Sequence, residues 1–132
     1  MDRPAHAGLR HLALNARDLA ARKRFYVDLL GFAVEWEPDA DNVYLTSGAD
    51  NLALHRVESP APGSPPGALD HLGLIVRSAD DVDRWAGFLE SRGVVLAAQP
   101  RTHRDGARSC YFSDPDGNSI QIIHHPPISQ KL

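Results

Sequence analysis

The chain has 132 residues, of which 42% are hydrophobic and 23% charged, so it holds enough apolar residues for one globular domain but is too short for two independent ones. Its formal net charge is −3, with no basic stripe and no long run of like charges, which argues against nucleic acid or an anionic membrane surface as partner and favours a small molecule. No stretch is as apolar as a secretory signal or a membrane span, and the single cysteine, Cys110, excludes an internal disulfide framework. These features predict a cytoplasmic protein in which Cys110, within an apolar strand-like stretch, is buried.

The first half of the chain predicts a strand, a helix and three further strands. In the strand expected over 9–16, side chains alternate between faces, so that His11 lies opposite the leucines. Asp18 is typical of a helix N-cap, and apolar residues then recur at helical spacing until Gly31, which predicts a helix over about 19–30. Alternating apolar and polar residues predict the three strands that follow, at 32–37, 43–46 and 52–57.

The second half repeats this βαβββ pattern. A strand expected over 69–76 is followed by Ser78 and Asp81, which are spaced as in a capping box and predict a helix that ends at Gly93. The three remaining strands are expected at 94–97, 109–112 and 119–123, with the turn sequence Asp114-Pro115-Asp116-Gly117 before the last of them.

A proline- and glycine-rich segment separates the two halves. Residues 58–68 contain four prolines and two glycines, so they do not fit inside a regular element. We interpret the chain as a single domain of two modules, about 9–57 and 69–124, joined by this linker.

The two modules begin with similar strands that carry a histidine at the same place. His71 follows His11 by sixty residues, within two apolar strands of the same length. A duplicated strand with one histidine per copy is able to bring two imidazoles to a single point. The alternative is an accidental match of two apolar strands.

These motifs resemble the vicinal oxygen chelate superfamily, which includes glyoxalase I, extradiol dioxygenases, fosfomycin-resistance proteins and bleomycin-resistance proteins. The resemblance covers about residues 9–124 and rests on His11-Leu12-Ala13-Leu14, Asp18-Leu19, Phe25-Tyr26, Leu30-Gly31-Phe32, His71 and Asp114-Pro115-Asp116-Gly117-Asn118-Ser119-Ile120-Gln121. It implies an α+β fold in which two βαβββ modules form a curved mixed sheet around a central cavity, with the helices on the outer face. It also implies a homodimer in which modules of two chains complete the site.

The resemblance further implies a site for one divalent metal ion. Its ligand positions lie on the first and last strands of each module and here carry His11, His71, His55 and Gln121. The family's metalloenzymes have glutamate at the position of Gln121, and a neutral amide keeps an oxygen ligand but is not a proton-accepting base. Imidazoles suit Zn, Fe, Ni or Mn, and an ion held by neutral ligands keeps its double charge, which favours an anionic oxygenated substrate.

Each of these positions has a plainer interpretation. His11 and His71 are alternatively histidines that are hydrogen-bonded on a polar sheet face, with no ligand. A slip of one residue in strand register would turn His55 outward. Gln121 is either a weak metal ligand or a pocket amide that hydrogen-bonds a bound molecule.

Five other residues are candidates for substrate contact. Trp36 and Tyr44 offer aromatic surface to a ligand. His103 lies in a polar loop, where it is either solvated or part of a lid in which Arg101 or Arg108 binds an anionic group.

Two functions of different classes therefore remain. The first is a metal-dependent lyase, isomerase or dioxygenase in which the ion polarises neighbouring oxygens of the substrate. The second is a protein of the bleomycin-resistance type that binds or sequesters a small molecule without any metal.

Overall fold

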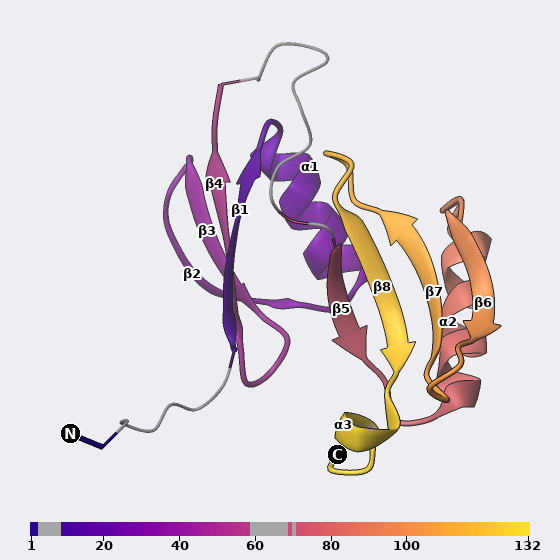
Figure 1. The fold of residues 1–132 in the computed structure, drawn as a ribbon. Coiled ribbons are helices and arrows are strands. Elements are labelled where there is room, and N and C mark those ends of the chain that lie inside the picture. The colour runs from indigo at the N-terminus through magenta and orange to yellow at the C-terminus, as the bar shows by residue number, and fades with distance from the viewer. Residues whose placement is uncertain (3–8, 59–68, 70) are drawn as a thin grey trace. The chain divides into compact units, whose positions relative to one another are not determined.

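The computed structural model describes residues 1–2, 9–58, 69 and 71–132, and the chain divides into two compact units. We call Met1–Ser64 unit 1 and Pro65–Leu132 unit 2. Each unit contains one four-stranded sheet with a helix against it (Figure 1), so the expected pair of βαβββ modules is confirmed. Apart from Glu58, the expected linker lies outside the described residues.

Unit 1 is built on a mixed sheet with the strand order β1-β4-β3-β2, in which β1 and β4 run parallel and the other pairs run antiparallel. Along the chain its elements are β1 (His11–Ala16), α1 (Leu19–Arg24), η1 (Phe25–Leu29), β2 (Ala33–Asp39), β3 (Asn42–Thr46) and β4 (Asn51–Arg56).

The helical segment of unit 1 starts and ends where the sequence predicts. The Asp18 side chain accepts a hydrogen bond from the backbone N–H of Ala21, and Gly31 adopts a φ of +82°, which lets the chain turn away from the helix. Between these ends, α1 gives way to one π-helical turn, η1, where the sequence had suggested a single regular helix. The core between helix and sheet is built from residues that include Leu14, Tyr26, Leu45 and Leu54.

Unit 2 repeats the topology, with the strand order β5-β8-β7-β6 and a parallel pair formed by β5 and β8. Its elements are β5 (His71–Ile75), α2 (Ala79–Ser91), β6 (Ala98–Thr102), β7 (Arg108–Ser113), β8 (Ser119–His124) and the short helix α3 (Pro126–Ser129). The capping box of Ser78 and Asp81 at the start of α2 is confirmed.

One strand of unit 2 lies elsewhere than expected. The sequence predicted a strand at 94–97, but these residues are irregular and Val95 is 86% exposed, whereas β6 follows at Ala98–Thr102. This strand contains Pro100, and proline donates no ladder hydrogen bond. Since β6 is an edge strand, this proline is tolerated.

The two faces of each sheet differ in chemistry, as strand alternation requires. In unit 2 the face toward α2 carries Cys110, Phe112, Ile120 and Ile122, each at most 1% exposed, and burial raises the pKa of the Cys110 thiol. The burial predicted for Cys110 is thus confirmed. The opposite face carries polar and aromatic side chains and holds the candidate site. Within the described residues, no helix combines the length and apolar character needed to cross a membrane.

Candidate functional site

In unit 2, three side chains from three neighbouring strands form what we call the His71 cluster. It consists of His71 on β5, Gln121 on β8 and Tyr111 on β7. Tyr111 is the register partner of Gln121, while His71 faces Ser119, two residues before Gln121 on the same strand. The rings of His71 and Tyr111 meet edge to face, with centroids 5.6 Å apart.

The amide of Gln121 has a fixed orientation in this cluster. Its Nε2 donates a hydrogen bond of 2.7 Å to the hydroxyl oxygen of Tyr111, and the residue is only 7% exposed. Its Oε1 lies on the side of β5, because a Cβ placed on Gly73 would stand 3.6 Å from it. Because Gly73 has no side chain, no Cβ at this position of β5 contacts the oxygen, which faces the strand that carries His71.

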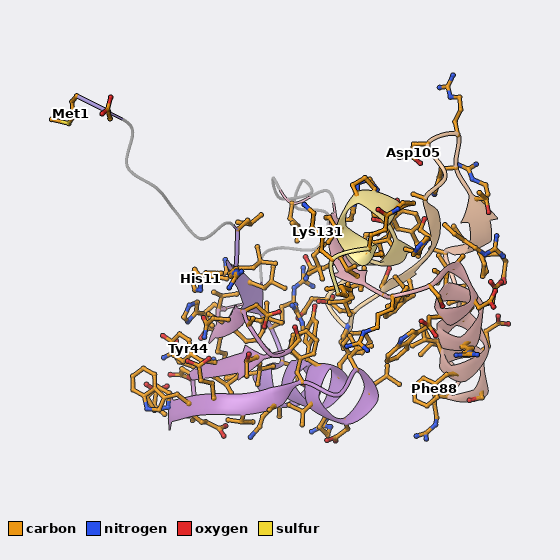
Figure 2. All side chains as sticks on the ribbon, turned by 90° about the horizontal axis from the view of Figure 1, so that it is seen from below. Met1, His11, Tyr44, Phe88, Asp105 and Lys131 are labelled. Atoms are coloured by element: carbon orange, nitrogen blue, oxygen red, sulfur yellow. The ribbon has the colours of Figure 1, made fainter. Side chains whose placement is uncertain are left out.

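A cavity of about 680 Å³ opens beside the cluster, entirely within unit 2. Tyr111, Gln121 and Ile123 line its sheet side, and the other side is lined by the end of β6 (Arg101 and Thr102) and by the following loop up to Ala107; Figure 2 shows Asp105 in this loop. Two arginines and one aspartate of this segment contribute, so its side chains carry a net positive charge and favour an anionic ligand.

His103, the first residue of the loop, makes hydrogen bonds to side chains on two strands of the sheet. Arg101 donates a hydrogen bond of 3.2 Å to Nδ1 of His103, because a guanidinium has no acceptor. Nε2 therefore carries the proton of the neutral ring and donates at 2.7 Å to the hydroxyl of Ser109. The half-buried His103 is thus an anchor of the loop and lines the cavity together with Arg101.

Arg108, which the sequence suggested as an anion-binding residue, lies on the other side of the sheet. It shares the face of Cys110 and Phe112, and its guanidinium makes two hydrogen bonds to Asp83 of α2, at 2.6 and 2.8 Å. This pairing lowers the pKa of Asp83 and raises that of Arg108. The strand alternation that places Tyr111 in the cavity therefore places Arg108 against the helix.

In unit 1, the structure does not bring His11 and His55 together. His11 faces Asn51 across the β1–β4 ladder, and His55 stands four residues further along β4, about 13 Å at the usual strand rise. The position of unit 1 that corresponds to Gln121 is Ala53, because Ala13 faces Ala53 just as Gly73 faces Gln121. The sequence analysis had assigned this ligand position to His55, which lies on the same face of β4 but two residues after Ala53.

Aromatic side chains surround His55 on the same face. Trp36, which is 60% exposed, stacks on Tyr44 with ring centroids 5.2 Å apart, and Tyr44 meets the His55 ring edge to face at 5.9 Å. Trp36 and Tyr44 therefore form an aromatic surface on this face of unit 1.

Sequence reasoning missed the residues that orient the candidate side chains. Tyr111 alternates with the buried Cys110 and Phe112, and this alternation was the available signal for its place on the polar face. Among the residues that the structure describes, no three histidine, cysteine, aspartate or glutamate side chains gather closely enough to hold a metal ion.

Comparison with known proteins identifies relatives over most of the chain. The family model of the Glyoxalase/Bleomycin resistance protein/Dioxygenase superfamily matches residues 8–122. The 2,2',3-trihydroxybiphenyl dioxygenase of Sphingomonas paucimobilis is 33% identical over 122 residues, which cover 87% of this chain and 40% of the dioxygenase. The metallothiol transferase FosB of Staphylococcus epidermidis is 28% identical over 115 residues, which cover 85% of this chain and 78% of the transferase. The chain thus spans less than half of the dioxygenase but most of the transferase.

The fold is also similar to that of solved structures. The lactoylglutathione lyase of Agrobacterium tumefaciens has a TM-score of 0.77 at 22% sequence identity, covering 92% of this chain and 96% of the lyase. At this identity the likeness concerns the fold.

Proposed function

The chain belongs to the Glyoxalase/Bleomycin resistance protein/Dioxygenase superfamily, and we propose that it is a divalent-metal-dependent enzyme acting on a small, anionic, oxygenated substrate. The observation that carries this proposal is the orientation of Gln121, whose carbonyl oxygen is turned toward the strand of His71 by the hydrogen bond to Tyr111. A relative whose name includes a metallothiol transfer activity supports metal dependence, and a dioxygenase relative supports oxygenated substrates.

The proposed metal ligands are His71 and Gln121 of unit 2, with His11 added from unit 1 on the family resemblance, either from the same chain or from a second copy. An imidazole nitrogen and an amide oxygen fit Zn, Fe, Ni or Mn. A bound ion would act as a Lewis acid that polarises oxygens of the substrate. His55 is left out of this set because of its distance along the ladder from His11.

The residues around the ligands have roles of their own. Arg101 and Arg104 line the cavity and attract an anionic substrate group. Tyr111 accepts the Gln121 amide hydrogen, so its own O–H is able to donate to an oxygen of a bound molecule. Gln121 does not accept a proton at physiological pH, and any proton-abstracting group must therefore be another residue.

We also propose a homodimer. Strands β1 and β5 each lie at the edge of their sheet, and exposed strand edges are commonly covered by association. The family resemblance, in which modules of two chains complete the site, supports the same assembly.

The second candidate function is binding of a small molecule without any metal. It is favoured by Gln121, a neutral and buried side chain whose amide already hydrogen-bonds Tyr111 and lines the cavity. In this case the cavity itself, with the arginine-containing loop, is the binding site.

Calorimetric titration of Zn, Ni, Mn and Fe(II) into the full chain separates the two functions. We expect binding at micromolar concentration, weakened at least about tenfold in His71→Ala and tightened in Gln121→Glu, which adds an anionic oxygen. His125→Ala is the matched control, since it removes a histidine near the C-terminus, away from the cluster. Absence of binding to both the wild type and Gln121→Glu would favour the metal-free function.

A further inference from the structure

Both histidines on the polar face of unit 1 bond to the asparagine that faces them across the sheet. His11 Nδ1 lies 2.8 Å from Oδ1 of Asn51, its register partner on β4. His55 Nδ1 lies 2.6 Å from Oδ1 of Asn42, its register partner on β3. The same His–Asn pairing thus occurs twice on one sheet, once in a parallel and once in an antiparallel ladder.

A carboxylate fixes the orientation of each asparagine. Nδ2 of Asn51 donates to Glu35 at 3.1 Å, and Glu35 lies at a register irregularity of β2. An ionised carboxylate only accepts hydrogen bonds, so the NH₂ end of the amide must point to it and the carbonyl oxygen must point to the imidazole.

The second asparagine is held in the same way. Nδ2 of Asn42 donates to both oxygens of Asp39, at 3.0 and 3.2 Å. The pKa of Asp39 is lowered, first by a hydrogen bond from the backbone N–H of Asp41 and next by this contact with Asn42. Asp39 is therefore ionised near neutral pH and acts as an acceptor for the amide.

These contacts determine which ring nitrogen carries the proton. Since Oδ1 of each asparagine is an acceptor, Nδ1 of the facing neutral histidine must be the donor. Nε2 then carries the lone pair. Free histidine in water prefers the opposite tautomer, with the proton on Nε2. We call each carboxylate–asparagine–histidine chain of hydrogen bonds a relay, and the two relays therefore reverse this tautomer preference of the imidazole.

We propose that Asn51, oriented by Glu35, is a positioning residue that holds His11 in the Nδ1–H tautomer and presents Nε2 as the atom that binds a divalent cation. The relay from Asp39 through Asn42 holds His55 in the same tautomer. The tautomers follow from unit 1 alone, whereas the consequence for metal binding rests on the proposed function. Figure 2 shows His11 and Tyr44, which mark this part of unit 1.

Long-range ¹H–¹⁵N NMR of the full chain, with a chelator and at mildly alkaline pH, reports the tautomer of each neutral histidine directly. We expect His11 and His55 to show a protonated Nδ1 and an unprotonated Nε2. Asn51→Leu should return His11 to the Nε2–H form without changing His55, and Asn42→Leu should do the reverse. A wild-type spectrum in which His11 carries its proton on Nε2 overturns the proposal even if a variant fails to fold.

Zinc titration tests the consequence for binding. We expect Asn51→Leu to weaken zinc binding roughly 10- to 100-fold, the usual effect of losing a residue that orients a metal-bound histidine. Asn51→Asp keeps an acceptor oxygen and should restore both the tautomer and most of the affinity. Glu35→Gln should weaken zinc binding by less than Asn51→Leu does. Glu37→Gln, an equal charge change on the same exposed strand, should leave the zinc affinity unchanged.

The outcomes distinguish this inference from the proposed function. If the tautomers are as expected but the wild type binds none of Zn, Ni, Mn and Fe(II), the proposed function fails and the positioning role of the asparagines stands. If zinc binds with equal affinity to the wild type and Asn51→Leu, the role of Asn51 in metal binding is refuted while the proposed function stands.

Discussion

At the scale of single residues, the chemistry of the candidate site depends on one amide. Gln121 keeps the oxygen that a carboxylate would offer to a cation but not the charge or the basicity. Its position on the polar face was predictable from strand alternation, as was that of His71. The contact with Tyr111 was not, because it depends on the β7–β8 register, which a single sequence does not contain.

The hydrogen bond between Gln121 and Tyr111 makes a measurable contribution. Tyr111→Phe removes the acceptor and leaves a buried amide donor without its partner, which should lower the free energy of unfolding by about 1–3 kcal/mol. Chemical denaturation measures this difference. Tyr44→Phe is the matched control, since the side chain is half-buried on the corresponding face of unit 1, and an equal loss in both variants would contradict the assigned bond.

At the scale of elements, the ends of helices were more predictable than the contacts between elements. The Asp18 cap, the Ser78–Asp81 capping box and the turn before Gly117 depend on neighbouring residues, and all three are present. The pair of Asp83 and Arg108 joins α2 to β7 across 25 residues of sequence, and no local pattern reveals it. Sequence reasoning therefore assigned Arg108 to the cavity instead of the helix.

The contribution of this pair to stability should depend on pH in a defined direction. The Arg108 guanidinium lowers the pKa of Asp83, so the carboxyl is more acidic in the folded than in the unfolded chain. The stabilisation is complete above the ordinary aspartate pKa of about 4 and is lost as the pH falls through the folded value. The difference in unfolding free energy between the wild type and Arg108→Met should thus shrink below about pH 4.

Denaturant titrations at several pH values measure this difference. Arg104→Met serves as the control, because it removes an arginine of the cavity loop and leaves the Asp83 pair intact. A stability difference for Arg108→Met that stays constant down to acid pH would show that Asp83 is not its partner in solution.

At the scale of the whole molecule, the repeated βαβββ pattern was readable because each module has its own helix caps and alternating strands. The position of the edge strand of unit 2 was not predictable from the sequence. Pro100 is untypical of a strand although it lies in β6, and the apolar residues 94–97 have a strand-like pattern although they are irregular.

Association of two chains is the prediction that belongs to this scale. We expect a homodimer in sedimentation velocity experiments at micromolar concentration, because β1 and β5 lie at sheet edges, which are commonly covered by association, and a second copy is one source of the proposed ligand His11. Dilution should reveal the monomer at lower concentration. A monomer at all concentrations tested would contradict the assembly.

Elemental analysis of the purified protein tests the central claim, that the chain binds a divalent metal through the His71 cluster. The protein must be prepared without a polyhistidine tag or a nickel column, and the His71→Ala variant must be prepared in parallel. We predict a stoichiometric amount of Zn, Fe, Ni or Mn in the wild type, removed by dialysis against a chelator and strongly reduced in His71→Ala. A wild type that contains no more metal than His71→Ala would contradict the account and leave the metal-free binding protein in its place.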